Sequence, residues 1–585
     1  MAAIFLGMPA RTGTAHVVTT TRKYKGQVYR THLLRRSYRE GGKVKNETLG
    51  NLSHLPETLI DLIRRALQGE TFVPLAQAFA ITASRPHGHV QAVALALQRL
   101  GIAALLASKP CRERQLVLAM LAARIVAPHT KLATTRWWHT TTLAEEFGVA
   151  EATEDDLYAA MDWLLARQDR IERKLAARHL SAGSLVLYDL SSSYFEGSAC
   201  PLAKLGYSRD GKPGLPQVNY GLLTDARGCP IAVSVHDGNV ADSQTLLPAV
   251  QRLRADFGIE QLVLVGDRGM ISSKAIAVLR QTDGIGWITA LKSASIRALV
   301  EQGQLQLGLF DERNLLELQS PDYPGERLVA CRNPELARLR AYKREELLAA
   351  TERNLEKIQA RVVAGKLTGA AAIGVRVGKV INQYQVAKHF DLEIGDTGLQ
   401  CARNPARIAA EAALDGLYLI RTSVSASRMD APECVRNYKA LANVERAFRS
   451  LKTIDLKVRP IHHRLADRVR AHIFLCLLAY YVEWHLREAW RELLFADDDR
   501  AAQAERDPVA PAQRSARALR KASTQRLDDG RPAHSFRTLL EELASVVRNT
   551  CRTRGADADA PSFQLVTTAN PTQQRALALL EAITV

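Results

Sequence analysis

Residues 262–269, Leu-Val-Leu-Val-Gly-Asp-Arg-Gly, decide the fold of this chain. A short apolar run that ends at a glycine predicts a buried strand, and Asp267 follows directly after it. Residues 185–189, Leu-Val-Leu-Tyr-Asp, repeat the pattern and end on Asp189. Buried runs of this kind are typical of central strands, so we expect the two strands to lie side by side with both aspartates at or near their ends.

The segments around these two strands alternate between strand and helix patterns. A turn at Asp225-Ala226-Arg227-Gly228 separates two apolar runs and predicts a hairpin. The further predicted elements are strands at 218–224, 230–236, 286–292 and 414–421, and helices at 245–257 and 273–280. This order predicts an α/β fold, in which a mixed sheet carries helices on its faces.

A third acidic residue, Glu445, lies in a predicted helix that spans residues 438–452. At about 100° per residue, Val444, Phe448 and Leu451 share one face of this helix. The neighbouring face carries four polar side chains: Tyr438, Glu445, Arg449 and Lys452. We therefore expect the first face to pack against the core and the second to be available for chemistry.

Two regions precede the sheet. Residues 14–53 mix β-branched and aromatic residues with lysine and arginine around Gly41-Gly42, which predicts a hairpin or a small sheet. Such a surface can follow a DNA backbone, or it can be a solvated sheet edge whose charges prevent aggregation, and the pattern favours neither.

Residues 90–180 instead predict helices, at 90–107, at 112–126, and from a capping-box-like Thr153-Glu154-Asp155-Asp156 to residue 180. Nothing in them singles out a helix that reads DNA.

The remaining segments interrupt or follow the sheet. A highly charged helix begins at Asn333-Pro334 and ends at Gly365, and strand-like stretches follow at 374–381 and 383–390. Residues 296–413 therefore predict an inserted lobe. The later predicted elements are a core helix at 465–493, a flexible charged linker at 497–533 and a last helix at 535–547.

The composition of the chain limits the kinds of binding partner and the cellular compartment that fit it. The chain has 585 residues, too many for one core, and a formal net charge of +18, which favours a polyanion such as nucleic acid as the partner. Its eight cysteines form no CxxC pair, so neither a disulfide framework nor a zinc ribbon is indicated, and a reducing cytoplasm fits. No basic leader and no membrane-length apolar run is present, so we expect a cytoplasmic, unexported protein.

Four stretches, taken in order, give the chain a family resemblance. They are residues 188–196, 237–245, 265–270, and 438–452 followed by Arg459-Pro460-Ile461. With this order the chain resembles the DDE transposases of bacterial insertion sequences, in the branch whose glutamate lies in a Y-x2-R-x3-E-x6-K signature. One position departs from the signature, because Leu441 replaces the arginine. Its phosphate contact is then lost or is supplied by Arg436, Lys439 or Arg449.

The resemblance implies an RNase H-like fold in which Asp189, Asp267 and Glu445 bind the catalytic metal ions. Hard carboxylate ligands suit two Mg²⁺ ions, with Mn²⁺ as a substitute, and two such ions about 3.5–4 Å apart can activate a water and stabilise the leaving 3′ oxygen. We expect Asp189 to bridge the two ions, while Asp267 and Glu445 each complete one site. Tyr438, Arg449 and Lys452 would hold the DNA backbone near the cut.

The implied activity is the cutting of transposon ends and the joining of their 3′-OH to target DNA. The implied partners are double-stranded DNA, both terminal inverted repeats and target, and a second copy of the chain in a homodimer on DNA at the nucleoid. A metal-dependent nuclease of the same fold without strand transfer stays open as an alternative. A DNA-binding protein with an inert site is a third reading, and the complete set of three acids argues against it.

The sequence thus predicts an RNase H-like mixed-sheet core with an inserted lobe, preceded by a β-rich and an all-α region. The predicted boundaries are 1–75 for the basic β-rich region, 76–182 for the helical subdomain, 183–295 and 414–495 for the two parts of the core, 296–413 for the lobe, and 496–585 for the charged linker and helical tail.

Overall fold

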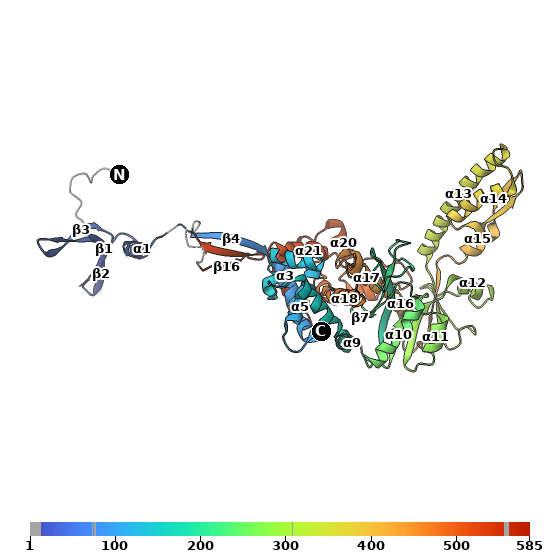
Figure 1. Cartoon of the computed structure of the whole chain (residues 1–585), viewed down its shortest axis with the longest axis horizontal. Coiled ribbons are helices and arrows are strands. Elements are labelled where there is room, and N and C mark those ends of the chain that lie inside the picture. The colour runs from blue at the N-terminus through green and yellow to red at the C-terminus, as the bar shows by residue number, and fades with distance from the viewer. Residues whose placement is uncertain (1–12, 73, 75–77, 307, 555–560, 585) are drawn as a thin grey trace. The chain divides into compact units, whose positions relative to one another are not determined.

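The computed structural model describes residues 13–72, 74, 78–306, 308–554 and 561–584. The chain divides into two compact units. The first comprises Met1–Ser84 and Asn549–Leu565, and the second comprises Arg85–Arg548 and Val566–Val585. Figure 1 shows the whole chain, coloured from the N-terminus in blue to the C-terminus in red, with labels on many of its helices and strands.

The first unit contains the sheet predicted for residues 14–53. Strands β1 (Thr14–Tyr24), β2 (Gln27–Glu40) and β3 (Lys43–Asn51) pair antiparallel in that order, and helix α1 (Glu57–Leu67) follows. Gly41 and Gly42 have φ angles of 58° and 80°, the left-handed conformation that a tight hairpin turn requires. The predicted hairpin is therefore confirmed, while residues 1–12 of the predicted N-terminal region lie outside the described residues.

Most residues of another sheet, which the sequence did not predict, belong to the first unit. This sheet is formed by three strands in the order β16-β15-β4: β16 (Phe563–Val566), β15 (Val547–Thr553) and β4 (Phe79–Pro86). The hydroxyl of Thr82 donates to the carbonyl of Thr550. A C-terminal segment thus pairs with a segment near the N-terminus, a long-range contact that local pattern does not reveal.

The second unit begins with a helical region, in which the helices Lys131–Trp137 and Leu143–Glu146 were not predicted. The helices of this region are α3 (Gly88–Arg99), α4 (Ile102–Leu106), α5 (Arg112–Val126), α6 (Lys131–Trp137), α7 (Leu143–Glu146), α8 (Glu154–Leu165) and α9 (Gln168–His179). The capping box at Thr153 and Asp156 is confirmed. Two of the predicted helices are each broken into two, the first at Gly101, whose φ of 61° ends a right-handed helix.

Helix α5 is buried along nearly its whole length within this helical region. In the described part of the chain, no single helix is both long and apolar enough to cross a membrane. The bent pair Arg112–Val126 and Lys131–Thr140 passes that test by length and composition only. The burial of α5 is the ordinary state of a core helix.

The centre of the second unit is an eight-stranded sheet in the order β10-β11-β14-β9-β8-β5-β6-β7. Its strands are β5 (Ser184–Tyr194), β6 (Gln217–Asp225), β7 (Pro230–Asp237), β8 (Leu262–Val265), β9 (Ile285–Ala290), β10 (Leu315–Leu318), β11 (Arg327–Arg332) and β14 (Leu417–Thr422). β5, β6 and β7 pair antiparallel, whereas β8 is parallel to both β5 and β9. The expected mixed sheet is confirmed, and every residue of β6 and β8 is buried.

Helices cover this sheet as predicted. They are α10 (Asp242–Ala255), α11 (Ser273–Leu279), α12 (Ser293–Glu301), α16 (Ala431–Lys439), α17 (Leu441–Arg449) and α18 (Ala466–Ala489). Helix α18 is buried from Ala471 to Leu486 and packs against β7, α5 and α8. It therefore joins the helical region to the sheet.

The insertion between the second and third acids is smaller than 296–413. Strands β10 and β11 belong to the main sheet, and a separate apolar cluster holds only the segments from α13 onward. Those elements are α13 (Pro334–Val363), α14 (Ala370–Gln383), β12 (Phe390–Ile394), β13 (Leu399–Arg403) and α15 (Pro405–Ala412). Asn333 caps α13, as its Asn-Pro start predicted.

The predicted strands at 374–381 and 383–390 are wrong. Helix α14 contains all of the first, and the second is mostly a turn and the 3-10 helix Ala387–His389, which ends just before β12. Ile373, Val377 and Ile381 are buried at spacings of four residues, so they form a helical face. That face packs against α13. Tertiary packing here overrides the strand preference of β-branched residues.

The predicted flexible linker at 497–533 is also wrong, because this segment is folded. It contains α19 (Arg500–Ala504) and α20 (Ala516–Thr524). Asp497 accepts hydrogen bonds from the backbone and hydroxyl of Ser515, and the fully buried Lys521 pairs with Asp498 at 3.2 Å. Helices α21 (Phe536–Ala544) and α22 (Pro571–Glu581) follow. Charged side chains of this segment therefore form ion pairs and hydrogen bonds within the protein, instead of only contacting solvent.

Candidate active site

Asp189 and Asp267 belong to two neighbouring central strands and lie near the point where the shorter strand, β8, ends. β5 and β8 are parallel neighbours, and Leu187 is in register with Val265. Two residues further along each chain are Asp189, still within β5, and Asp267, just past the end of β8. The predicted neighbourhood of these two aspartates is therefore what the strand register produces.

The carboxylate of Asp189 lies in an unfavourable place for a negative charge. Its Oδ1 accepts a hydrogen bond from the backbone of Leu190 at 2.8 Å. Burial, together with the negative charges of Asp267 and Glu445, raises its pKa to about 7, although the Leu190 amide and Arg209 lower it. All three predicted acids thus act on one another electrostatically, although they come from distant parts of the chain.

Asp267 is exposed and is oriented by its own loop. Its Oδ1 accepts hydrogen bonds from the backbone amides of Gly269 and Met270, at 3.0 and 2.7 Å. The sequence Gly-Asp-Arg-Gly after β8 thus forms a turn that folds back onto the carboxylate. The second oxygen of Asp267 is left for another ligand.

Glu445 lies on the exposed side of α17, as the helical pattern predicted. On the opposite side Val444, Phe448 and Leu451 are buried. The ring of Phe448 contacts Tyr220 of β6 edge-on, with centroids 5.8 Å apart. This packing of α17 onto the sheet brings Glu445 towards the two aspartates.

The four polar side chains predicted to share one helical face do not do so. Tyr438 is half-buried on α16; burial and the charges of Asp267 and Glu445 raise its pKa, which places it beside those acids. Arg449 is exposed. Lys452, in contrast, is buried, because residues Ser450–Ile454 form a turn of π-helix that changes the angular spacing after α17.

Lys452 binds inside the protein. Its Nζ lies 2.6 Å from Oδ1 of Asp210 and donates to the hydroxyl of Ser191 at 3.1 Å. Arg459 reaches the other oxygen of Asp210, also at 2.6 Å. Sequence reasoning missed Asp210, because Ser208-Arg209-Asp210-Gly211 has the composition of an ordinary turn.

Arg209 is a second residue that sequence reasoning missed. It lowers the pKa of Asp189, and its Nη2 lies 2.5 Å from Oδ1 of Asp242. Asp242 is the first residue of α10, a position where a carboxylate can accept from the free backbone amides of a helix N-terminus. The carboxylate of Asp242 binds Arg209 instead, so this arginine is held at the edge of the acidic cluster.

The structure also locates the alternatives for the missing signature arginine. Leu441 packs against the core. The Nζ of Lys439 donates to the carbonyls of Val509 and Ala510, both at 3.1 Å, so it is held by the C-terminal segment. Arg436 and Arg449 are exposed and are free of that restraint.

The three acids suit a hard divalent cation. They supply carboxylate oxygens from two strand ends and one helix, the donor type that Mg²⁺ and Mn²⁺ prefer. Their mutual repulsion at Asp189 is relieved when a cation is bound. The fit rests on this donor chemistry and charge.

Among solved structures, the chain resembles a piggyBac transposase synaptic complex with hairpin DNA, with 10% sequence identity, a TM-score of 0.25, and coverage of 80% of this chain and 88% of that chain. A TM-score this low carries no weight for the fold or the function. No match was found among curated proteins.

Two family models match the chain in separate places. Residues 199–482 match the transposase DDE domain, a span that begins after Asp189 and includes Asp267 and Glu445. Residues 17–73 match the N-terminal domain of IS1634 family transposases. With a DDE domain behind the N-terminal domain of an insertion-sequence family, the chain is a DDE transposase of an insertion sequence.

Proposed function

We propose that the chain cuts the ends of its transposon and joins the freed 3′-OH to target DNA at the site formed by Asp189, Asp267 and Glu445. The observation that carries the proposal is the register of β5 and β8, which sets Asp189 level with Asp267. The negative charge of Glu445 raises the pKa of Asp189, and this interaction supports Glu445 as the third acid of the site. The family uses divalent metal ions, and we propose two Mg²⁺ ions, for which Mn²⁺ can substitute.

Each acid has a distinct role in this proposal. Asp189 would be the ligand shared by the ions, and Asp267 and Glu445 would each complete one metal site. When bound, the ions lower the pKa of a water nucleophile and neutralise charge on the phosphate. The Gly269 and Met270 amides fix one oxygen of Asp267, so its other oxygen points to a ligand with little loss of entropy.

We propose that Tyr438, Arg449 and Arg209 contact the DNA backbone beside the acids. Tyr438 lies next to Asp267 and Glu445, and Arg449 is exposed one helical turn beyond Glu445. Lys452 contributes through Asp210, by holding the loop between β5 and β6 next to the site. Two chains would each hold one transposon end, as a homodimer at the nucleoid.

Single substitutions test the assignment. Asp189→Asn, Asp267→Asn and Glu445→Gln should each abolish cleavage of DNA that carries the terminal repeats, and each should leave binding of that DNA intact. Asp283→Asn is the matched control, because Asp283 is an exposed acid just before β9, at the opposite end of the parallel strands. Cleavage that survives in any of the three variants would refute the role of that residue.

The nuclease alternative is separated by its product. With Mg²⁺ and pre-cut ends carrying a free 3′-OH, a transposase joins the ends to a target plasmid, whereas a nuclease releases only cut DNA. Joined product that is lost in Asp189→Asn supports the proposal. Repeated cutting without joined product, under conditions in which the ends are bound, would favour the nuclease.

A further inference from the structure

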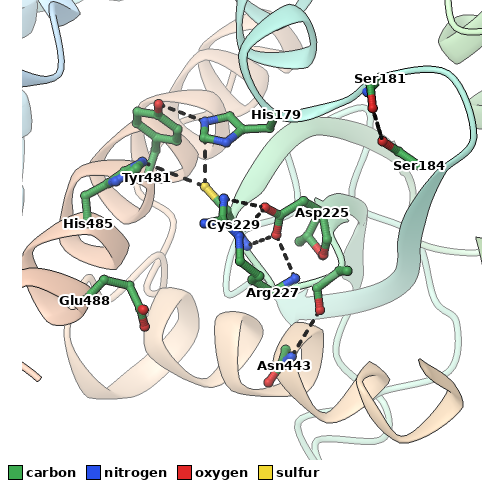
Figure 2. Close-up of polar contacts among 12 residues, drawn as sticks. His179, Ser181, Ser184, Asp225, Arg227, Cys229, Asn443, Tyr481, His485 and Glu488 are labelled. Atoms are coloured by element: carbon green, nitrogen blue, oxygen red, sulfur yellow. Dashed lines mark hydrogen bonds and ion pairs between the residues drawn. The ribbon is translucent and has the colours of Figure 1, made fainter. Parts of the chain in front are cut away.

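Three metal-binding side chains converge away from the acidic site. His179 lies at the end of α9, Cys229 directly precedes β7, and His485 lies in α18 (Figure 2). The Nε2 atoms of both histidines lie 3.9 Å from Sγ of Cys229. All three potential ligand atoms lie within 4.8 Å of one another.

We propose that His179, Cys229 and His485 bind a structural zinc ion. Bond lengths of 2.0–2.1 Å to nitrogen and 2.3 Å to sulfur put the two kinds of ligand about 3.5 Å apart in a tetrahedral site. The observed 3.9 Å contracts to that value by small side-chain movements. Two imidazoles and a thiolate are soft to borderline ligands, so the site selects Zn²⁺ over the Mg²⁺ of the acidic cluster.

The backbone around Cys229 is already fixed in place. Asp225 Oδ1 accepts hydrogen bonds from the backbone amides of Arg227 and Cys229, both at 2.9 Å. The Oδ2 of Asp225 pairs with the guanidinium of Arg227, so the positive charge of this neighbouring arginine is balanced by a carboxylate. The ligands therefore need little rearrangement to receive an ion, and binding replaces the thiol proton of Cys229, which passes to solvent.

Next to the histidines, Tyr481 offers a further polar group. Its hydroxyl lies 3.0 Å from Nε2 of His179, and its ring contacts His485 at a centroid distance of 4.7 Å. The ring contact orients the His485 imidazole, and the hydroxyl lies where an oxygen can support the ion. A water molecule or this hydroxyl completes the four-coordinate site.

The position of the site gives the ion a structural task. It would tie three elements together: the last helix before the sheet, the β6–β7 turn, and the core helix α18. The same turn supports α17, because Asn443 donates to the carbonyl of Ala226 at 3.4 Å. A Cβ placed on Gly228 would lie only 2.7 Å from the Cβ of Asn443. The ion would thus stabilise the surface on which the helix of Glu445 rests.

The chain offers a matched control within the same helix. Cys476 and His472 are both buried, and Sγ of Cys476 lies 3.9 Å from Nε2 of His472. This pair reproduces one cysteine–histidine contact of the proposed site, and among the described residues it is not part of a three-ligand group. If the contact at Cys229 were only a buried Cys–His contact without metal, substitution of Cys229 and substitution of Cys476 would have the same effect on zinc content.

Zinc content provides the direct test. The full-length protein, purified without chelator and dialysed against Mg²⁺ buffer, should hold one zinc ion per chain by elemental analysis. Cys229→Ser and His485→Ala should lower zinc affinity by about tenfold or more, whereas Cys476→Ser should keep it. A protein that takes up no zinc when supplied with it, or a Cys229→Ser variant with unchanged zinc content, would overturn the proposal.

Two further measurements cover variants that fold poorly. In the unaltered chain, zinc should protect the Cys229 thiol from alkylation after brief exposure to denaturant, and Co²⁺ in its place should show thiolate-to-metal charge transfer. Modification of Cys229 at the same rate with and without zinc contradicts the site. Glu445→Gln should retain zinc, so failure of the transposase assignment and failure of the zinc site are distinguishable.

Discussion

Nζ of Lys452 and Oδ1 of Asp210 lie 2.6 Å apart in the interior of the second unit, where the Asp210 side chain is only 3% exposed. Asp210 also accepts a hydrogen bond from the backbone of Tyr194, at the end of β5. The signature lysine therefore holds the loop after the strand of Asp189, rather than lying on the surface with Arg449.

A double-mutant cycle tests this contact. Breaking a buried ion pair by removing one partner costs about 3–5 kcal/mol, so Lys452→Met and Asp210→Asn should each lower the free energy of unfolding markedly. The double variant should lose at least about 1 kcal/mol less than the sum of the two, because both changes remove the same contact. Additive losses in chemical denaturation would show that the pair contributes nothing. The exposed pair of Arg64 and Asp61 provides a control in which all changes should be small.

The salt dependence of DNA binding separates Arg449 from Lys452. Each phosphate contact adds about 0.9 to the slope of log affinity against log salt concentration. Arg449→Ala should therefore reduce the slope by about one, and Lys452→Met should leave it unchanged, because the Lys452 amine is bound to Asp210. Binding is measured on duplex DNA that carries a terminal repeat, at several salt concentrations. An equal reduction for Lys452→Met would mean that this lysine leaves Asp210 for a phosphate.

Local sequence pattern predicted six of the eight strands of the main sheet, and it missed β10 and β11, whose residues it assigned to the inserted lobe. Short apolar runs predicted β5, β8 and β9, and the spacing of Val444, Phe448 and Leu451 predicted the buried face of α17. These signals work because the strands are buried on both faces and the helix on one.

Pattern failed where distant contacts decide the structure. Helix α14 was read as strand because its β-branched residues pack against α13 in a lobe with its own core. Lys452 was placed on the surface because nothing in the signature reveals the π-helical turn at Ser450–Ile454. Sequence spacing also did not predict two groups of residues, because their contacts join separate segments of the chain. They are Arg209 with Asp210, and the cluster of His179, Cys229 and His485.

The N-terminal sheet should bind DNA through its exposed tip. Across β1 and β2, Arg22 faces Tyr29 and Thr21 faces Arg30, and the side chains of Tyr24 and Tyr29 are more than half exposed. Replacing Lys23, Lys25 and Arg30 with Gln should weaken DNA binding and lower its salt slope, with little change in Tm, because these side chains lie on the surface.

The control for this prediction replaces tyrosine rather than charge. Tyr29→Ser should weaken binding without changing the salt slope if the ring stacks on sugars or bases. Unchanged affinity in the triple Gln variant would support the other reading of the sequence, in which the charges only protect a sheet edge.

Glu172 makes the stability of the second unit depend on pH. Its carboxyl is fully buried; burial raises its pKa from 4.5 to about 7, although Arg252 and the backbone amide of Val233 lower it. Between these pH values the unfolded chain has released the proton and the folded chain has kept it, so stability falls as pH rises and levels off above about 7. The fall corresponds to roughly 3 kcal/mol.

The variant Glu172→Gln should remove this fall in stability, while Arg252 stays paired with Asp169 at 2.7 Å. Denaturation at pH 5 and pH 8 measures the difference, with the exposed Asp169→Asn as the control, and an equal fall in Glu172→Gln and the unaltered chain would contradict the assignment.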